Sequence, residues 1–375
     1  MSKDEDQEEE ATTVKMPKLR KLSGLAIPAV LLAGLLTAET AGAQNAASAK
    51  PESTVRLQIS PADKDSPFNM KEHHVHILSA RSVAADRHSP LPLTEAVSEA
   101  RKTAAKRASA VPESAAALAS SIPGVPAPGY YPADLSNPGN GKVVTTAKSH
   151  PVYVDCAASC WGDPLTFLDH LGDSDFMHIT DQYVGSTAND RYKEGTASSI
   201  TFPVFTALTD NDILQIAHSA AKAHGTGYGH IYHLFLPQGV DVCFTGTTVC
   251  YSPDNPATFV FCAYHGSVDF TDIGHVLFSV EPFQDVPGCS LTQPSPNGSL
   301  IDSTSSTLAH ELIETITDPD GTAWIALNSL GVFGEEIGDL CVDPFGNEAT
   351  TVLDGKAYEI QQMYSNNFHA CANVP

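Results

Sequence analysis

The sequence predicts a mixed α/β fold for the C-terminal part of the chain, with a central mixed sheet flanked by helices. Two observations lead to this prediction. After residue 140, apolar runs of strand length alternate with segments that place apolar residues at helical spacing. All eight cysteines also follow residue 150, which favours a single disulfide-linked domain in that part of the chain.

The strands and helices of this domain are assigned from the period of their apolar residues. In the clearest helical segment, Asp210 can cap the start, an apolar stripe follows, and Gly225 comes directly after the end. The expected strands are short apolar runs bounded by turn or polar residues. The predicted strands are 151–154, 231–236, 259–263 and 276–280, and the first predicted helices are 165–171 and 210–224.

Residues 1–43 are expected to be a signal peptide region. Basic side chains precede an apolar run over residues 22–38, and Ala41-Gly42-Ala43 follows as a cleavage site before Gln44. The run is short for a membrane span, so we expect cleavage, with an uncleaved anchor as the alternative. The protein is therefore expected to be secreted or to lie at the cell surface, without membrane attachment after cleavage.

Residues 44–140 are rich in alanine, serine and proline, which predicts a mostly disordered pro-segment or spacer. Within this segment, residues 55–59 alternate like a short strand and residues 93–108 have a helical pattern. Several prolines then lead to Gly139-Asn140-Gly141, where we place the domain boundary. The globular domain is accordingly expected to span residues 141–375.

The cysteines are expected to form disulfides, because an even number in an exported chain favours them over free thiols. Spacing of the Cys-x2-Cys type is absent, which argues against a structural zinc knuckle. Sequential pairing closes the shortest loops. The predicted pairs are Cys156–Cys160, Cys243–Cys250, Cys262–Cys289 and Cys341–Cys371.

The formal net charge of −23 makes nucleic acids and anionic membranes poor partners. Most of this excess belongs to residues 141–375. The sequence contains no Gly-x-Ser-x-Gly elbow and no Walker loop, so no motif supports a serine hydrolase or a nucleotide-binding protein. Aspartate and asparagine residues in loops are compatible with calcium, although no EF-hand spacing occurs.

The most informative stretch is an amphipathic helix that begins near Ser303 and ends at Asp318-Pro319. His310 and Glu314 are four residues apart, so both side chains project from one face and can bind one cation. Glu311 lies beside them as a potential base. The arrangement is that of a zincin-like His-Glu-x-x-His helix with glutamate in place of the second histidine. The alternative is an ordinary solvated polar face.

A third ligand for this cation has to come from another segment. Asp318 lies eight residues after His310, or about 12 Å along a helix axis, and cannot reach the same cation unless the chain folds back. Asp339 and Glu336 belong to a separate acidic segment and can approach freely. We expect Asp339 to be the third ligand and Glu336 to be the second choice, with solvated loop carboxylates as the alternative.

Other histidines have more than one interpretation. His265 follows Cys262 at the end of a predicted strand and can be a metal ligand, a catalytic donor to the transition state, or a structural histidine. His73, His74 and His76 form a tract in the spacer. We interpret the tract as incidental, with a weak metal site as the alternative.

Several short motifs accompany the metal-site helix. They are His310–Pro319, Ala323-Trp324, Glu336–Cys341, Cys262–Gly266, and Tyr364–Asn366 with Cys371. Together they resemble the Exordium-like, phosphate-induced family and its bacterial and fungal secreted relatives over about residues 150–375. The resemblance implies an exported, disulfide-linked domain with a metal-dependent peptidase activity. Ala263 departs from the glycine that is usual there, and some relatives that lack the His-Glu pair suggest a non-enzymatic extracellular role.

The predicted function is that of an exported zinc-dependent hydrolase, most simply a metallopeptidase acting on a peptide or protein. Glu311 would activate a water at a zinc ion held by His310, Glu314 and Asp339. The alternative is a non-catalytic extracellular or cell-surface module, with a structural metal site or none, whose partner is an extracellular component. The domain is expected to be a monomer.

Overall fold

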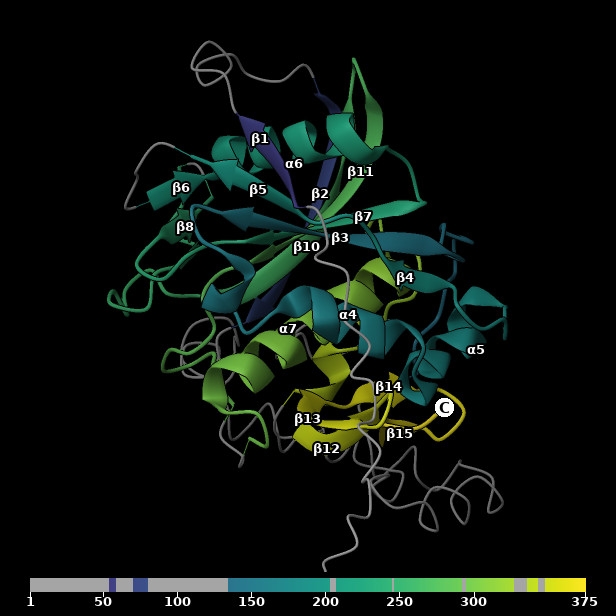
Figure 1. The fold of residues 1–375 in the computed structure, drawn as a ribbon. Helices are drawn as coiled ribbons and strands as arrows, with labels where there is room; N and C mark the ends of the chain where they lie inside the picture. The colour runs from purple at the N-terminus through teal and green to yellow at the C-terminus, as the bar shows by residue number, and fades with distance from the viewer. Residues whose placement is uncertain are drawn as a thin grey trace, which may run out of the picture. The chain divides into compact units, whose positions relative to one another are not determined.

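A mixed eight-stranded sheet is the central feature of the computed structural model (Figure 1). The strands follow the order β1-β5-β3-β7-β11-β10-β2, and β4 pairs with β3 outside this path. The bounds of these strands are β1 Val55–Gln58, β2 Met70–Ser79, β3 Ala147–Val154, β4 Tyr192–Glu194, β5 Ser198–Thr201, β7 His230–Phe235, β10 Phe261–Phe270 and β11 Gly274–Glu281.

The structure describes only part of the chain. The predicted signal peptide and the helical pattern at 93–108 lie outside the described residues. No helix among the described residues is long and apolar enough to cross a membrane. The described residues are 54–58, 70–79, 134–202, 207–244, 246–291, 295–326, 336–342 and 348–375.

The sheet is parallel on one side and antiparallel on the other, which confirms the prediction of a mixed sheet. Strands β1, β5, β3 and β7 run parallel, and β11 joins β7 in parallel. Beyond β11 the direction alternates, because β10 pairs antiparallel with both β11 and β2. Strand β10 thus lies between two antiparallel partners near one edge of the sheet.

Helices cover both faces of the sheet (Figure 1). Helix α6 (Asp210–His224) packs on one face, and helices α4 (Pro164–Gly172) and α7 (Ser299–Thr317) pack on the other. Successive residues of β7 belong to different apolar clusters, Ile231 with α7 and Tyr232 with α6. This alternation is what a buried strand produces when both of its faces are covered.

The smaller elements lie around this core. They include two-stranded sheets β12-β13 and β14-β15 and a three-stranded sheet β6-β8-β9. Their bounds are η1 Ala158–Cys160, η2 Asp175–Thr180, α5 Asp181–Val184, β6 Ala207–Thr209, β8 Asp241–Cys243, β9 Cys250–Tyr251, η3 Asp339–Cys341, β12 Glu348–Leu353, β13 Lys356–Gln361, β14 Met363–Ser365 and β15 Ala370–Ala372.

All four predicted disulfides are present. Cys156 pairs with Cys160, Cys243 with Cys250, Cys262 with Cys289, and Cys341 with Cys371. None of the cysteines is free. Four disulfides indicate a protein that folds in an oxidising environment, as extracellular proteins do.

Strands β1 and β2 come from the segment that we expected to be mostly disordered. β1 matches the alternating pattern at 55–59, but β2 had no predicted counterpart. Ser136 also exchanges backbone hydrogen bonds with Ile325, at 2.9 and 3.0 Å. The described sheet therefore includes residues that precede the boundary at 141, because strand pairing with β5 and β10 depends on backbone groups rather than on an apolar composition.

Two predicted elements have different limits in the structure. α7 begins at Ser299 after Gly298, so Ser303, near which we expected the helix to start, lies inside it. β10 continues well past Ala263, which places His265 in the middle of the strand rather than at its end. β10 remains a strand through this polar stretch because it is hydrogen-bonded to β2 on one side and to β11 on the other.

Candidate metal centre

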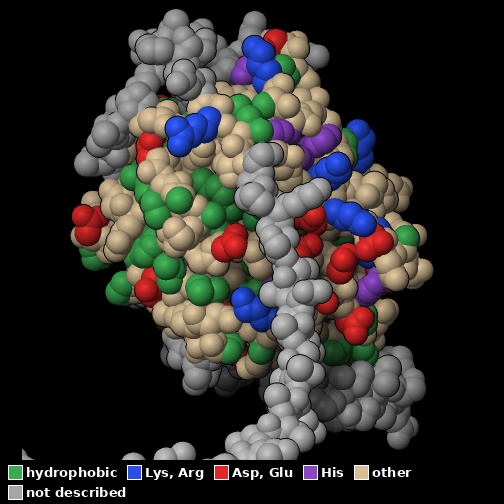
Figure 2. Space-filling model, viewed as in Figure 1, with side chains coloured by type: hydrophobic (Ala, Val, Ile, Leu, Met, Phe, Trp, Pro, Cys, Tyr) green, Lys and Arg blue, Asp and Glu red, His purple; other side chains and the backbone are tan. Residues whose placement is uncertain are grey.

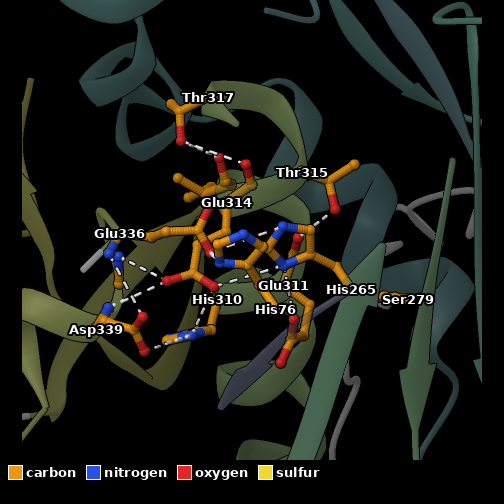
Figure 3. A network of polar contacts seen from close by, with 12 residues as sticks. His76, His265, Ser279, His310, Glu311, Glu314, Thr315, Thr317, Glu336 and Asp339 are labelled. Atoms are coloured by element: carbon orange, nitrogen blue, oxygen red, sulfur yellow. Dashed lines mark hydrogen bonds and ion pairs between the residues drawn. The ribbon is translucent and has the colours of Figure 1, made fainter. Parts of the chain in front are cut away.

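The acidic face of α7 lies against the sheet instead of facing solvent. His310 and Glu311 are 0% exposed and Glu314 is 2% exposed. Side chains from β2, β10 and the segment leading into η3 point toward the same region (Figure 3). The alternative of a solvated polar helix face is therefore wrong.

His310, Glu314 and Asp339 form the first group of potential ligands. Nε2 of His310 lies 3.0 Å from Oε2 of Glu314 and 3.9 Å from Oδ1 of Asp339. The three ligand atoms all lie within 4.8 Å of one another. Tetrahedral zinc with bonds of about 2.0–2.1 Å needs ligand atoms about 3.3 Å apart, so a small adjustment would suit the ion.

Backbone contacts hold Asp339 over α7. The amides of Gly338 and Asp339 both donate to Oε1 of Glu314, each at 3.1 Å. Gln361 in β13 donates to the carbonyl of Gly338 at 2.6 Å, and the Cys341–Cys371 disulfide ties the end of η3 to β15. One carboxylate of the helix thus positions the segment that carries the third ligand.

Glu311 lies next to this group and contacts His265. Its Oε2 is 3.3 Å from Nδ1 of His265, and its Oε1 is buried without a hydrogen-bond partner. Burial, together with the carboxylates of Glu314 and Glu281, raises the pKa of Glu311 well above its usual range. A carboxylate with a raised pKa and a free oxygen can accept a proton.

His310 and Glu314 influence each other strongly. Burial opposes charge on both, yet Glu314 raises the pKa of His310 and His310 lowers the pKa of Glu314. A metal ion bound between His310 and Glu314 would replace the proton of His310 as the positive partner of the Glu314 carboxylate.

Glu336 belongs to a second group, with His76 and Asp318. Oε2 of Glu336 lies 2.9 Å from Nδ1 of His76, and the ligand atoms of the three residues lie within 4.8 Å of one another. Asp318 does not join the His310 group, in agreement with the helix-length argument. His76 was interpreted as part of an incidental tract, with a weak metal site as the alternative, and the structure places it in this group because β2 pairs with β10.

His265 lies between the two groups. Its Nδ1 is 3.6 Å from Oε2 of Glu314, and its Nε2 is 3.8 Å from Oε2 of Glu336. Burial lowers the pKa of His265 to about 3, so its imidazole is neutral at neutral pH. A neutral imidazole can bind a metal or share a proton with Glu311.

A buried polar chain extends from His265 across the sheet. Ser279 is opposite His265 in β11, and His233 is opposite Ser279 in β7. Oγ of Ser279 lies 2.8 Å from Nδ1 of His233 and donates to Glu281 at 2.7 Å. These residues were not predicted as part of the site, although His233 interrupts an otherwise apolar strand.

Electrostatics make a cation the natural occupant of the cluster. The ion pairs of Glu311, Glu314 and Glu336 among the described residues are all with histidines, and none is with lysine or arginine. Burying a carboxylate without a cationic partner is costly. His76 is 32% exposed, so the cluster approaches solvent on the side of β2.

Comparison with protein-family models, curated proteins and solved structures found no match. The resemblance to the Exordium-like family therefore stays a prediction from the motifs. The buried histidine and glutamate side chains could hold a metal ion.

Proposed function

We propose that this protein is an exported metal-dependent hydrolase, specifically a zinc metallopeptidase of the Exordium-like kind that acts on peptides or proteins. The observation that supports it best is the convergence of His310, Glu314 and Asp339, with Glu311 one residue from the first ligand. Imidazole and carboxylate together suit zinc better than calcium, which prefers oxygen ligands alone.

Each residue has a distinct part in the proposed reaction. His310, Glu314 and Asp339 hold the zinc, which when bound supplies Lewis-acid activation of water and of the substrate carbonyl. Glu311 accepts the proton of the attacking water at its unpartnered Oε1 and passes it to the leaving amine. His265 positions the Glu311 carboxylate through the contact of its Nδ1 with Oε2, 3.3 Å apart.

The test separates metal binding from proton transfer. In Glu311→Gln the chain should retain its zinc, measured by elemental analysis, while hydrolysis of a broad peptide library falls by about 100-fold or more. Glu194→Gln in β4, a partly buried glutamate outside the cluster, should change neither. Unimpaired cleavage by Glu311→Gln, or no cleavage by the zinc-loaded wild type, would contradict the proposal.

A non-catalytic extracellular module with a structural metal is the second candidate. The nearly complete burial of Glu311, Glu314 and Glu336 favours it, since structural sites are closed. It predicts that a chelator lowers the melting temperature markedly and that no peptide is cleaved with zinc bound. Retained stability after chelation would argue against it.

A further inference from the structure

A second set of metal-ligating side chains lies beside the proposed zinc site and shares no residue with it. A ring nitrogen of His76 and carboxylate oxygens of Asp318 and Glu336 lie within 4.8 Å of one another. They come from β2, from the end of α7, and from the segment that leads into η3. Three separate parts of the chain therefore converge on one point.

The two carboxylates present oxygens without hydrogen-bond partners. Oδ1 of Asp318 accepts from the amides of Thr322 and Ala323, at 2.6 and 2.7 Å, while its Oδ2 is buried without a partner. Glu336 is 0% exposed, and its Oε1 has no hydrogen-bond partner. Burying a carboxylate oxygen lowers the stability of the fold unless a hydrogen-bond donor or a cation binds it.

Strand pairing and a tight turn hold the His76 ring in place. His76 is opposite His265 in the register of β2 and β10, and the two rings stack at 5.5 Å. Gly321 follows Asp318 with a φ of +67°, and a Cβ there would lie 2.7 Å from Nε2 of His76. The turn covers one ring nitrogen, while Nδ1 is directed at Glu336 (Figure 3).

One divalent cation cannot balance the charge of the whole cluster. Five carboxylates are at most 5% exposed, and among the described residues the side chains that pair with Glu311, Glu314 and Glu336 are histidines, with no lysine or arginine. An ion at His310 would leave the carboxylates of the second group without a cation. The buried carboxylates are Glu311, Glu314, Asp318, Glu336 and Asp339.

We propose that His76, Asp318 and Glu336 bind a second zinc ion, so that the protein holds a two-metal centre with His265 between the two sites. One imidazole and two carboxylates are a ligand set that zinc accepts, with room for a water molecule. Since His76 belongs to β2, the segment before the expected domain boundary supplies a ligand. This site does not depend on catalysis at the first one.

The test counts zinc ions in the full chain. Elemental analysis and calorimetric zinc titration should find two ions in the wild type and one in both His76→Ala and Asp318→Asn. The asparagine keeps the acceptor for Thr322 and Ala323 but removes the anionic oxygen. His178→Ala, a partly exposed histidine paired with Asp181, is the matched control and should still bind two.

The outcomes separate this proposal from the proposed function. A wild-type stoichiometry below two, or a stoichiometry of two that persists in either variant, would overturn the second site. Peptide cleavage in the same samples reports on the proposed function alone. A chain that binds two ions but cleaves nothing would leave this inference standing while the peptidase proposal fails.

Discussion

Gly338 allows the third ligand segment to approach α7 closely. A Cβ at this position would lie 2.4 Å from Nδ1 of His310 and 2.9 Å from Oε1 of Glu314. Its φ is negative, so space rather than backbone conformation requires the glycine. The two neighbouring side chains are almost fully buried and have little room to move aside.

Substituting this glycine should therefore disturb the proposed zinc site. In Gly338→Ala the displaced His310 and Glu314 should lower zinc affinity by about 10-fold or more and cost about 1–3 kcal/mol of stability. Zinc titration and urea unfolding measure the two effects. Gly229→Ala, where a Cβ meets nothing within 4 Å, is the control. Wild-type zinc affinity in Gly338→Ala would show that η3 is not packed as described.

At the scale of elements, α7 is a helix with many polar residues that is nevertheless buried along nearly its whole length. Some of its polar side chains are hydrogen-bonded to neighbouring segments. Asp302 accepts hydrogen bonds from the amide and side chain of Asn297 and from the amide of Glu359, and Ser306 accepts from the amide of Gln361. The helix thus anchors β13 through polar contacts as well as apolar packing.

Removing one of these acceptors should destabilise the domain. Asp302→Ala would remove the acceptor of the buried Glu359 amide and of the partly buried Asn297 amide and side chain, so we expect the free energy of unfolding, measured in urea, to fall by about 3 kcal/mol. Asp285→Ala removes an exposed bond to Ser299 near the same helix end and should cost less than about 1 kcal/mol. Equal losses in the two variants would refute the anchoring role of Asp302.

The β2–β10 pair shows which elements could be predicted from the sequence and which could not. Segments with regular apolar periods, such as 210–224 and 231–236, were predicted to within a residue or so at their ends. β2 was not predicted, because its residues carry no alternating apolar pattern. Its strand conformation depends on the partner β10, which lies almost 200 residues later in the chain.

At the scale of the whole molecule, the acidic side chains occur at several separate places on the visible face (Figure 2). The buried carboxylates of the histidine and glutamate cluster account for only a small part of the 44 acidic residues. A second ionisable cluster lies elsewhere, around His150 in β3. His150 stacks on His224 and His230, and its Nε2 is 3.0 Å from Nδ1 of His230.

This histidine cluster should limit stability in acid. Burial, together with the nearby His230, His224 and Lys148, lowers the pKa of His150 to about 4, although the hydrogen bond that its Nδ1 donates to the Thr196 carbonyl acts in the opposite direction. Between pH 6.5 and 4 the unfolded chain binds the proton more readily, so stability falls as the pH falls through this window. At pH 4, the protonation of His150 alone should lower the free energy of unfolding by about 3 kcal/mol relative to pH 7.

Urea unfolding at pH 7 and pH 4 measures this loss. His150→Gln cannot take up the proton, so its stability should fall by about 3 kcal/mol less than that of the wild type over the same range. His178→Gln, outside the cluster, should follow the wild type. Parallel losses in the wild type and His150→Gln would exclude a contribution from this histidine.

The sequence by itself determined the parts of this protein that depend on local pattern: the mixed α/β class, the amphipathic helix that ends at Asp318-Pro319, the four disulfide pairs, and three residues that converge as potential ligands, His310, Glu314 and Asp339. Only the tertiary structure decided which distant groups join them. His76 and Asp318 enter the cluster through strand register and a turn, and the polar face of α7 becomes buried because β10 and η3 cover it. Such contacts depend on the packing of segments far apart in the chain, which no local period or spacing records.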